Sequence, residues 1–393
     1  CNLDNDRKNG EKRTSSEITY SGIISNTKMS GKAFRFEDNY AEYMEMANRW
    51  ATKPLNYQAA GKYTQADIDE WREGLAKDPN GMDNPYGVPN YLAYPSTQWV
   101  DELFLSTTSQ KHNVSVVGSS ENTNYLLSFG YLDNPGTLKN TGLKNYSGRI
   151  NIETQITKFL KVGTQTYATF QTREPGNTSF TYMYQNTPAV TPYHDGKYGV
   201  SVDGASTSNL LADVMSRGGS YDDTRLNTTW YAKVNILDGL TAEARFNYQT
   251  LFNETATYSR KVDKQNFRTG EIIPGVSSST ATTSRATTRY QNHTNTATIN
   301  YAKTFGKHDI SILLGTEQYY WNVKGFSATR TGLLDLDLPD FTAALDLLDP
   351  TLGGTAEQDY GVISYFGRLN YAYKNRYLLN LHDLKHHHAL VKD

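Results

Sequence analysis

Long segments with alternating side-chain character constrain the fold of this chain more than any other feature. Tyr125, Leu127, Phe129 and Tyr131 alternate with Leu126, Ser128 and Gly130. Similar runs occupy residues 146–156, 160–171, 230–248, 297–314 and 363–381. Successive side chains of a β-strand point to opposite faces, so each run has one apolar and one wet face. This pattern is typical of a transmembrane β-barrel, in which the apolar face contacts lipid and the polar face lines a lumen.

The composition fits a barrel and excludes helical membrane spans. No apolar run in the 393 residues approaches the ~20 residues that a membrane helix needs. The net charge of -2 argues against a broad nucleic-acid footprint. The 29 tyrosines suit strands and the membrane–water boundary. They suit a Tyr-rich soluble β protein equally, so composition alone leaves both open.

The connections between the runs fall into two lengths. Tight turns are predicted at 157–159, 237–239, 305–307 and 374–376, and long loops at 173–226, 253–287 and 321–359. An outer-membrane barrel has short turns at one end and long loops at the other, whereas a β-sandwich has no reason to sort its loops by end. Aromatic residues beside the tight turns are expected to form a girdle at that interface. They are Phe159, Phe305, Tyr373 and Tyr377.

A helical insertion is predicted near the N-terminus. Residues 37–51 have apolar residues three and four positions apart, which indicates an amphipathic helix. A second helix is predicted at about 64–76, with Thr64 as its N-cap and Asp67 in its first turn. Residues 99–104 are predicted to form a last helical turn before the strands begin.

Several motifs, in the same order along the chain, resemble one family. They are WVDELF at 99–104, SQKHNVSVVG at 109–118, NYLLSFGYLD at 124–133, GTLK at 136–139, YSGRINI at 146–152, FLKVG at 159–163 and YFGRLNY at 365–371. This series resembles the barrel strands of SusC/RagA-type TonB-linked outer-membrane transporters of Bacteroidetes. The resemblance implies a barrel of about 22 strands filled by an N-terminal plug. The fold expected here is all-β: a partial antiparallel transmembrane barrel of about ten or eleven strands with a small helical insertion, lacking the plug and the C-terminal half of the barrel.

Four segments are expected along the chain. Residues 1–16 are a disordered or out-of-frame N-terminal segment, and 17–112 hold the first barrel strand and a helical extracellular insertion. Residues 113–381 form antiparallel barrel strands with long extracellular loops. Residues 382–393 form a non-native-looking tail, which is not expected to belong to the native barrel. Cys1 admits a lipoprotein anchor or a chain that starts mid-gene, and a frameshift is one hypothesis for the first six residues. The chain is expected to form a curved, strongly tilted sheet, or a smaller closed barrel forced by the missing half.

The sequence offers no enzyme, cofactor or metal site. It has no glycine-rich phosphate loop, no nucleophile elbow and no His-Glu-x-x-His motif. The cluster of His382, His386, His387 and His388 is read as accidental rather than as metal ligands. Glu153 and Glu243 lie on polar strand faces and are expected to pair with Arg149, Arg245 or Lys233.

The resemblance implies import of oligosaccharides or peptides through the bacterial outer membrane. A SusD-like surface lipoprotein would meet the long loops, and TonB would act through the plug. Loop aromatics are candidates for stacking on a ligand, or for packing on one another: Tyr182, Tyr184, Tyr193, Tyr198 and Trp321. The alternative is a secreted or lipid-tethered soluble β-rich carbohydrate-binding module. A two-layer module would bury Ile150, Phe170 and Phe246, whereas a barrel leaves them exposed.

Overall fold

One antiparallel sheet dominates the computed structural model. The structure describes residues 15–29, 39–51, 63–176, 186–259, 262–275, 281–332, 340–344, 350–374 and 376–391. Cys1 and nearly all of the segment 1–16 lie outside these residues. Strands account for most of what is described, so the predicted all-β class is confirmed.

The large sheet is a meander in which each strand pairs with its neighbours along the chain. Its order is β1-β2-β3-β4-β5-β7-β8-β11-β12-β14-β15, and all pairs are antiparallel. The bounds are β1 Ser15–Thr27, β2 Thr107–Ser119, β3 Thr123–Pro135, β4 Thr141–Gln155, β5 Leu160–Pro175, β7 Arg217–Leu237, β8 Leu240–Ser259, β11 Thr282–Phe305, β12 His308–Thr331, β14 Gln358–Tyr373 and β15 Tyr377–Val391. A short β13, Thr351–Gly353, pairs with β12.

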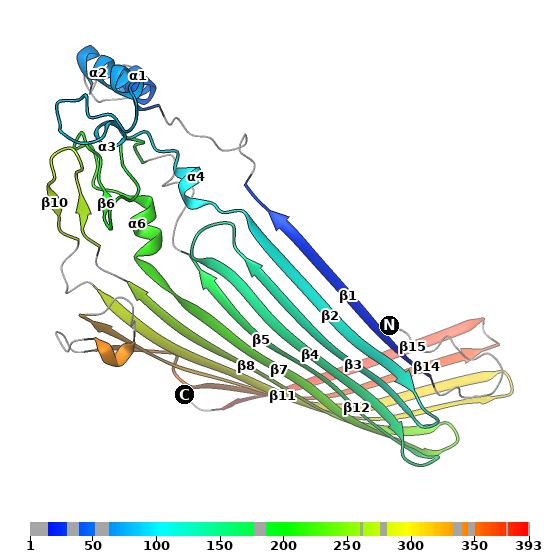
Figure 1. Ribbon diagram of the computed structural model, residues 1–393. Coiled ribbons are helices and arrows are strands. Elements are labelled where there is room, and N and C mark those ends of the chain that lie inside the picture. Colours follow the sequence, from blue (N-terminus) through cyan, green and yellow to red (C-terminus); the bar gives the residue numbers. More distant parts are fainter. Residues whose placement is uncertain are drawn as a thin grey trace.

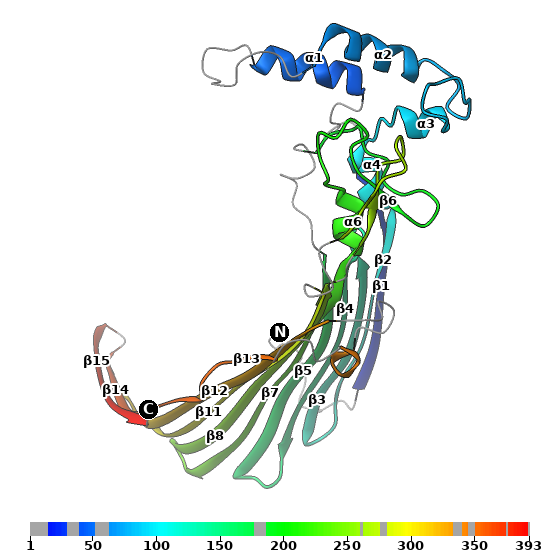
Figure 2. The same cartoon turned by 90° about the vertical axis from the view of Figure 1, so that its left-hand side faces the viewer.

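The sheet is open and strongly curved. β1 and β15 are its two edges, and the strands between them form an arc (Figure 1, Figure 2). A right-handed twist between neighbouring strands is the usual cause of such curvature. The predicted curved, open sheet is confirmed, and the alternative of a smaller closed barrel is wrong. β15 continues to Val391, so residues 382–391 are paired with β14. Their assignment to a tail stays a prediction.

The tight turns lie where the alternation placed them, but the loops are shorter than predicted. β8 extends to Ser259 and β12 to Thr331, so the connections run over 260–281 and 332–357. The loop after β5 covers 176–216. The residues that extend these strands include many Thr. The branched Thr side chain favours strands, but because it is polar it does not produce the apolar alternation from which the strands were predicted. Trp321, predicted in a loop, therefore lies inside β12.

Helices and short strands gather at the loop end of the sheet, in a part that we call the cap (residues 39–51, 63–104, 186–216 and 262–275). It contains α1 Tyr40–Ala51, α2 Gln65–Leu75, α3 Asn90–Ala93, α4 Trp99–Leu103 and α6 Leu210–Met215 (Figure 1). A small sheet of β6 Tyr198–Gly199, β9 Lys264–Gln265 and β10 Ile272–Ile273 joins them. A 3-10 turn, η2, covers Phe341–Ala343. The helices predicted for 37–51, 64–76 and 99–104 are all present.

None of the helices in the described part of the chain has both the length and the apolar character to cross a membrane.

The hydrophobic core of the described residues lies almost wholly in the cap. One cluster is centred on Tyr40, Met44 and Trp71. A second joins Trp99 and Leu103 to α6. In the large sheet and its connections the buried apolar side chains are few, namely Ala281, Val323, Ala328 and Ala344. The sheet is thus a single layer that no described element covers on either face.

The N-terminus of α2 is held by a capping box. The Thr64 hydroxyl accepts from the Asp67 backbone N–H at 3.2 Å, and Asp67 accepts from the Thr64 backbone N–H at 2.8 Å. These hydrogen bonds from Thr64, chiefly the backbone one, hold the pKa of Asp67 below its usual range. The capping box satisfies the backbone N–H groups of Thr64 and Asp67, which have no partner within the helix.

We expect Thr64→Ala to destabilise α2 by about 1 kcal/mol, because one N-cap acceptor is lost. Amide hydrogen exchange over residues 65–75 should accelerate, and Thr64→Ser should restore protection. The Asp67 contribution should be present above pH ~4 and disappear as the pH falls through its lowered pKa. Equal exchange in the Ala and Ser variants would contradict this role for the cap.

Candidate functional site

The strand register collects the apolar phase of every strand on one face, which we call the outer face. Leu127 lies opposite Ile150, and Trp230 lies opposite Phe246. Ile150 is 45% exposed, Phe170 47% and Phe246 37%. A two-layer core would bury all three, so the exposed outer face favours a barrel wall over a sandwich. An apolar surface of this extent indicates contact with a membrane or a partner.

The opposite face, here the inner face, is mostly polar, with single apolar residues such as Leu126 and Leu313. Asn151, Gln165, Thr229 and Asn247 follow one another across β4, β5, β7 and β8. The Asn247 amide donates to Asn227 and to Thr229, both at 2.8 Å. Side-chain hydrogen bonds of this kind satisfy polar groups that line a watery interior. The predicted two-faced alternation therefore holds through the sheet.

A charged cluster crosses β4, β5, β7 and β8 on the inner face. Glu153 forms an ion pair with Lys161 at 2.9 Å and accepts from the Tyr231 hydroxyl at 2.8 Å. The Arg245 guanidinium lies 5.1 Å from the centre of the Tyr231 ring. Tyr231 can lie here because its strand neighbour is Gly163, where a Cβ would come within 2.4 Å of the ring. An aromatic side chain that covers a glycine across the sheet also helps to fix the register.

The predicted partners of the two glutamates are partly right. Glu243 pairs with Arg245, but the two share one strand. Glu153 pairs with Lys161 across the tight turn, a partner that the sequence analysis missed. Arg149 instead places its guanidinium 5.2 Å from the Tyr167 ring. Side chains two residues apart, or facing each other across a hairpin, meet once the register is known.

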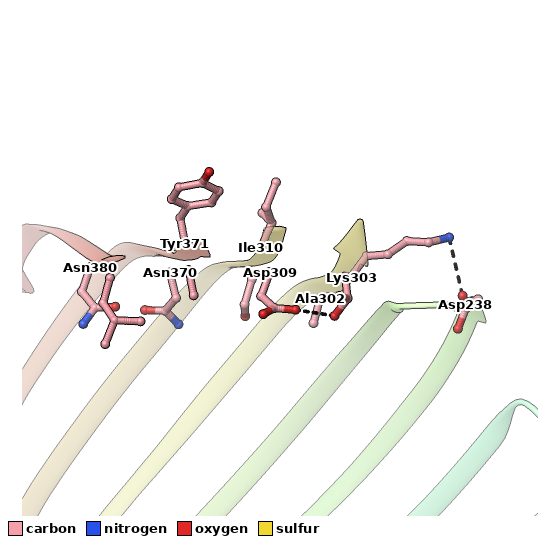
Figure 3. Close-up of a pocket in the computed structure, with 12 residues that line it drawn as sticks. Asp238, Ala302, Lys303, Asp309, Ile310, Asn370, Tyr371 and Asn380 are labelled. Atoms are coloured by element: carbon pink, nitrogen blue, oxygen red, sulfur yellow. Dashed lines mark hydrogen bonds and ion pairs between the residues drawn. The ribbon is translucent and has the colours of Figure 1, made fainter. Parts of the chain in front are cut away.

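A cavity of about 490 Å³ lies at the tight-turn end of β11, β12, β14 and β15 (Figure 3). Asn370 and Asn380 are register partners and point to the same side in the figure. Lys303 and Asp238 approach to 3.5 Å, and the Thr304 hydroxyl donates to Asp309. The lining is neutral or charge-paired, which suits packing or solvent more than catalysis.

Aromatic residues lie at two levels of the outer face. At the tight-turn end Phe159, Phe305 and Tyr377 are exposed, as predicted, and Tyr373 stacks on Tyr377 at 6.4 Å. A second set lies nearer the loop end and was not predicted. It comprises the pairs Tyr20–His112 (6.1 Å), Tyr131–Tyr146 (5.1 Å) and His293–Tyr320 (5.0 Å). The pair Trp230–Phe246 (5.7 Å) lies in the tight-turn half of β7 and β8. Aromatic side chains at two levels are typical of the two interfaces of a bilayer.

The described candidates for ligand contact, Tyr193, Tyr198 and Trp321, do not form one site. Tyr193 and Tyr198 meet in the cap, with ring centres 5.0 Å apart, and Tyr193 is 52% exposed. Tyr198 packs partly against the second core cluster. Trp321 lies in β12, opposite Asn292 and Tyr360. Tyr182 and Tyr184 lie outside the described residues. A ligand role for these residues stays a prediction.

The cap holds Arg268 among aromatic rings. Its guanidinium lies 4.3 Å from the Tyr86 ring, 4.8 Å from Trp71 and 5.0 Å from Tyr94, and it donates to the Ala93 carbonyl. Glu70 accepts from the Tyr86 hydroxyl at 2.6 Å. Desolvation and this hydrogen bond raise the pKa of Tyr86 to about 12. Arg268 thereby fastens the loop between β8 and β11 to the helical insertion.

We expect Arg268→Ala to loosen the cap by about 1–2 kcal/mol, because three cation–π contacts are lost. Limited proteolysis within 262–275 should accelerate. Arg268→Lys should recover only part of the protection, because an ammonium lacks the planar guanidinium. Arg330, whose guanidinium lies 5.6 Å from the Phe341 ring outside the cap, provides the control. Equal cleavage in Arg268→Ala and Arg330→Ala would contradict this role.

No group of three or more His, Cys, Asp or Glu side chains that could hold a metal occurs among the described residues. His382 lies in β15, and the side chains of His386, His387 and His388 lie outside the described part.

Curated relatives of the chain are TonB-dependent receptors. The chain is 24% identical over 310 residues to TonB-dependent receptor P3 of Formosa agariphila, covering 74% of this chain and 29% of the relative. It is 27% identical over 303 residues to TonB-dependent receptor P26 of the same organism (73% and 29%), and 22% identical over 321 residues to SusC of Bacteroides thetaiotaomicron (74% and 30%). The chain thus spans less than a third of the length of these relatives. No protein-family model matches it.

Among solved structures, the RagAB peptide transporter shares the fold. It superposes with a TM-score of 0.66 at 19% identity, covering 94% of this chain and 42% of that one. The same importer in its open-open state gives a TM-score of 0.65. The fold and the two-faced sheet define a partial antiparallel β-barrel. The resemblance to SusC/RagA-type TonB-dependent receptors, expected from the motifs, is confirmed over about three quarters of the chain.

Proposed function

We propose that the chain forms part of the barrel wall of a TonB-dependent nutrient importer in a bacterial outer membrane. The observation that carries the proposal is the exposed outer face, which is apolar between two levels of aromatic residues and is covered by no described element. Such a face is costly in water and favourable in hydrocarbon. The inner face, with its amides, hydroxyls and ion pairs, suits the water-filled side of a transporter.

We extend the proposal to cargo and partners. The cargo class is an oligosaccharide or a peptide, which is supported by the likeness to SusC and to a peptide importer. A SusD-like lipoprotein would meet the cap at the loop end, and TonB would act through a plug. The proposed segments are 1–16, 17–112 with the first strand and the insertion, 113–381 with the barrel strands, and 382–393.

The second candidate is a secreted or lipid-tethered carbohydrate-binding module. It would need a second layer against Ile150, Phe170 and Phe246, and the described residues provide none. Catalysis is not part of either proposal. The exposed Tyr193 in the cap is the one described candidate that a dissolved sugar or peptide reaches readily.

The proposal is tested by uptake in a strain that lacks the receptor containing this chain. Restoring the receptor should restore growth on oligosaccharides or on peptides as the sole carbon source, and a protonophore should abolish uptake without removing the protein from the outer membrane. Tyr193→Ala should weaken uptake if the cap contacts cargo. Recovery of the protein in the soluble periplasmic or culture fraction would overturn the proposal.

A further inference from the structure

A groove of about 680 Å³ runs along the outer face across β7, β8, β11, β12 and β14. One wall is the stacked pair Trp230 and Phe246, whose rings are 5.7 Å apart and nearly parallel. Tyr365 of β14 lines the other side, and the floor is made of small residues, including Ala244 and Ala297. Alanines directly opposite each other between aromatic side chains leave a channel that neighbouring atoms do not fill.

Two amide side chains lie on the loop side of this groove, in the same register row as Trp230 and Phe246. Asn295 of β11 and Gln318 of β12 are register partners, so they project side by side from the outer face. Neither makes a side-chain hydrogen bond with another described residue. The residues next to them along the two strands on this face are Ala297 and Thr316 on one side and His293 and Tyr320 on the other. Amide groups left without a partner at the edge of hydrocarbon cost free energy unless a ligand or water satisfies them.

We propose that this groove binds one acyl chain of a bilayer lipid whose ester carbonyl accepts hydrogen bonds from Asn295 and Gln318. The proposal rests on the proposed function, because it needs the outer face to contact lipid. On the outer face, the order of groups along β11 and β12, from the groove toward the tight turns, matches the order in the lipid. Apolar residues such as Ile299 and Leu314 lie toward the tight turns, and the amides lie beside the ring pair His293–Tyr320, which is typical of the interface where ester groups are found.

The polarity of the amides favours an ester-linked lipid over a second protein surface. Both amides can donate, and an ester carbonyl is an acceptor with no donor of its own. An ether-linked lipid with identical chains would fill the channel equally but accept weakly at best. A hydrocarbon chain also fits a channel between aromatic walls without the backbone hydrogen bonds that another strand would require.

The test compares ester- and ether-linked phosphatidylcholine of the same chain length, mixed equally in nanodiscs that contain the receptor to which this chain belongs. Lipid that stays bound after gentle detergent release is counted by native mass spectrometry. The chain should retain the ester lipid about fivefold over the ether lipid, which corresponds to one net hydrogen bond. Asn295→Leu with Gln318→Leu should reduce the ratio to about one, with insertion unchanged because apolar groups replace the amides.

Two alanine variants separate the groove from the face in general. Ala297→Phe fills the floor and should lower retention of both lipids, whereas Ala168→Phe, on the outer face of β5, should leave retention unchanged. If the receptor that contains this chain does not enter nanodiscs at all, the proposed function fails. If it enters but retains both lipids equally, or if the double leucine variant keeps the preference, the groove assignment is overturned. A retained second copy of the chain in place of lipid would also overturn it.

Discussion

Replacing Ile150 with arginine should prevent stable insertion of the sheet into a bilayer. Ile150 lies on the outer face, opposite Leu127, and is 45% exposed. A guanidinium at this position would have to enter hydrocarbon, which costs about 2–4 kcal/mol near the midplane of a barrel. A water-facing position would carry the same charge with little effect.

Asn151 supplies that matched control. It is the next residue of the same strand and lies on the inner face, opposite Leu126 and Gln165. Insertion can be followed as the fraction of the receptor containing this chain that migrates as a folded, heat-modifiable band after refolding into lipid vesicles. We expect Ile150→Arg to reduce that fraction strongly and Asn151→Arg to leave it near the unsubstituted value. Similar losses for both variants would contradict the assignment of the two faces.

Trp71→Ala should unfold the cap and spare the sheet. Trp71 is 2% exposed, and its ring lies 4.6 Å from Tyr40 and 5.5 Å from Tyr94. Removing a buried indole costs about 3–5 kcal/mol, through lost apolar burial and the cavity that remains. The Arg268 guanidinium would also lose one of its three rings. The first core cluster contains no residue of the large sheet, so the loss should stay local.

Hydrogen exchange resolved by mass spectrometry can test this separation. Residues 40–51 and 65–75 should lose protection in Trp71→Ala, while β3 and β4 should keep theirs. Trp230→Ala is the control, because that indole is 49% exposed on the outer face and touches no part of the cap core. Loss of protection in β3 and β4 together with the helices would show that cap and sheet unfold as one unit.

The strands and their faces were predictable because alternation is a local signal. Leu127 and Ile150 each belong to the apolar side of an alternating run. Antiparallel pairing of the two strands brings these sides onto the same face and places the two residues opposite each other. The capping box at Thr64 was predictable for the same reason, since its two partners are three residues apart. β6 and α6 are too short to show a period and were missed, although the equally short α4 was predicted.

The contacts that build the cap could not be predicted, because they join distant parts of the chain. Arg268 meets rings from residues 71, 86 and 94, and the sequence carries no sign of this pairing. Trp321 was misplaced because its strand continues through a segment without an apolar phase. The outer-face amides Asn295 and Gln318 became visible only when the register placed them together in a groove.

Spin labels on neighbouring residues of single strands provide the most direct test of the central claim that the apolar face contacts lipid. Labels at 150, 170 and 246 should collide with lipid-soluble oxygen in vesicles. Labels at 151, 169 and 247 should collide instead with a water-soluble nickel chelate, so that accessibility alternates with a period of two. Protection of positions 150, 170 and 246 from both reagents would mean that these side chains are buried in protein, and would contradict a barrel wall.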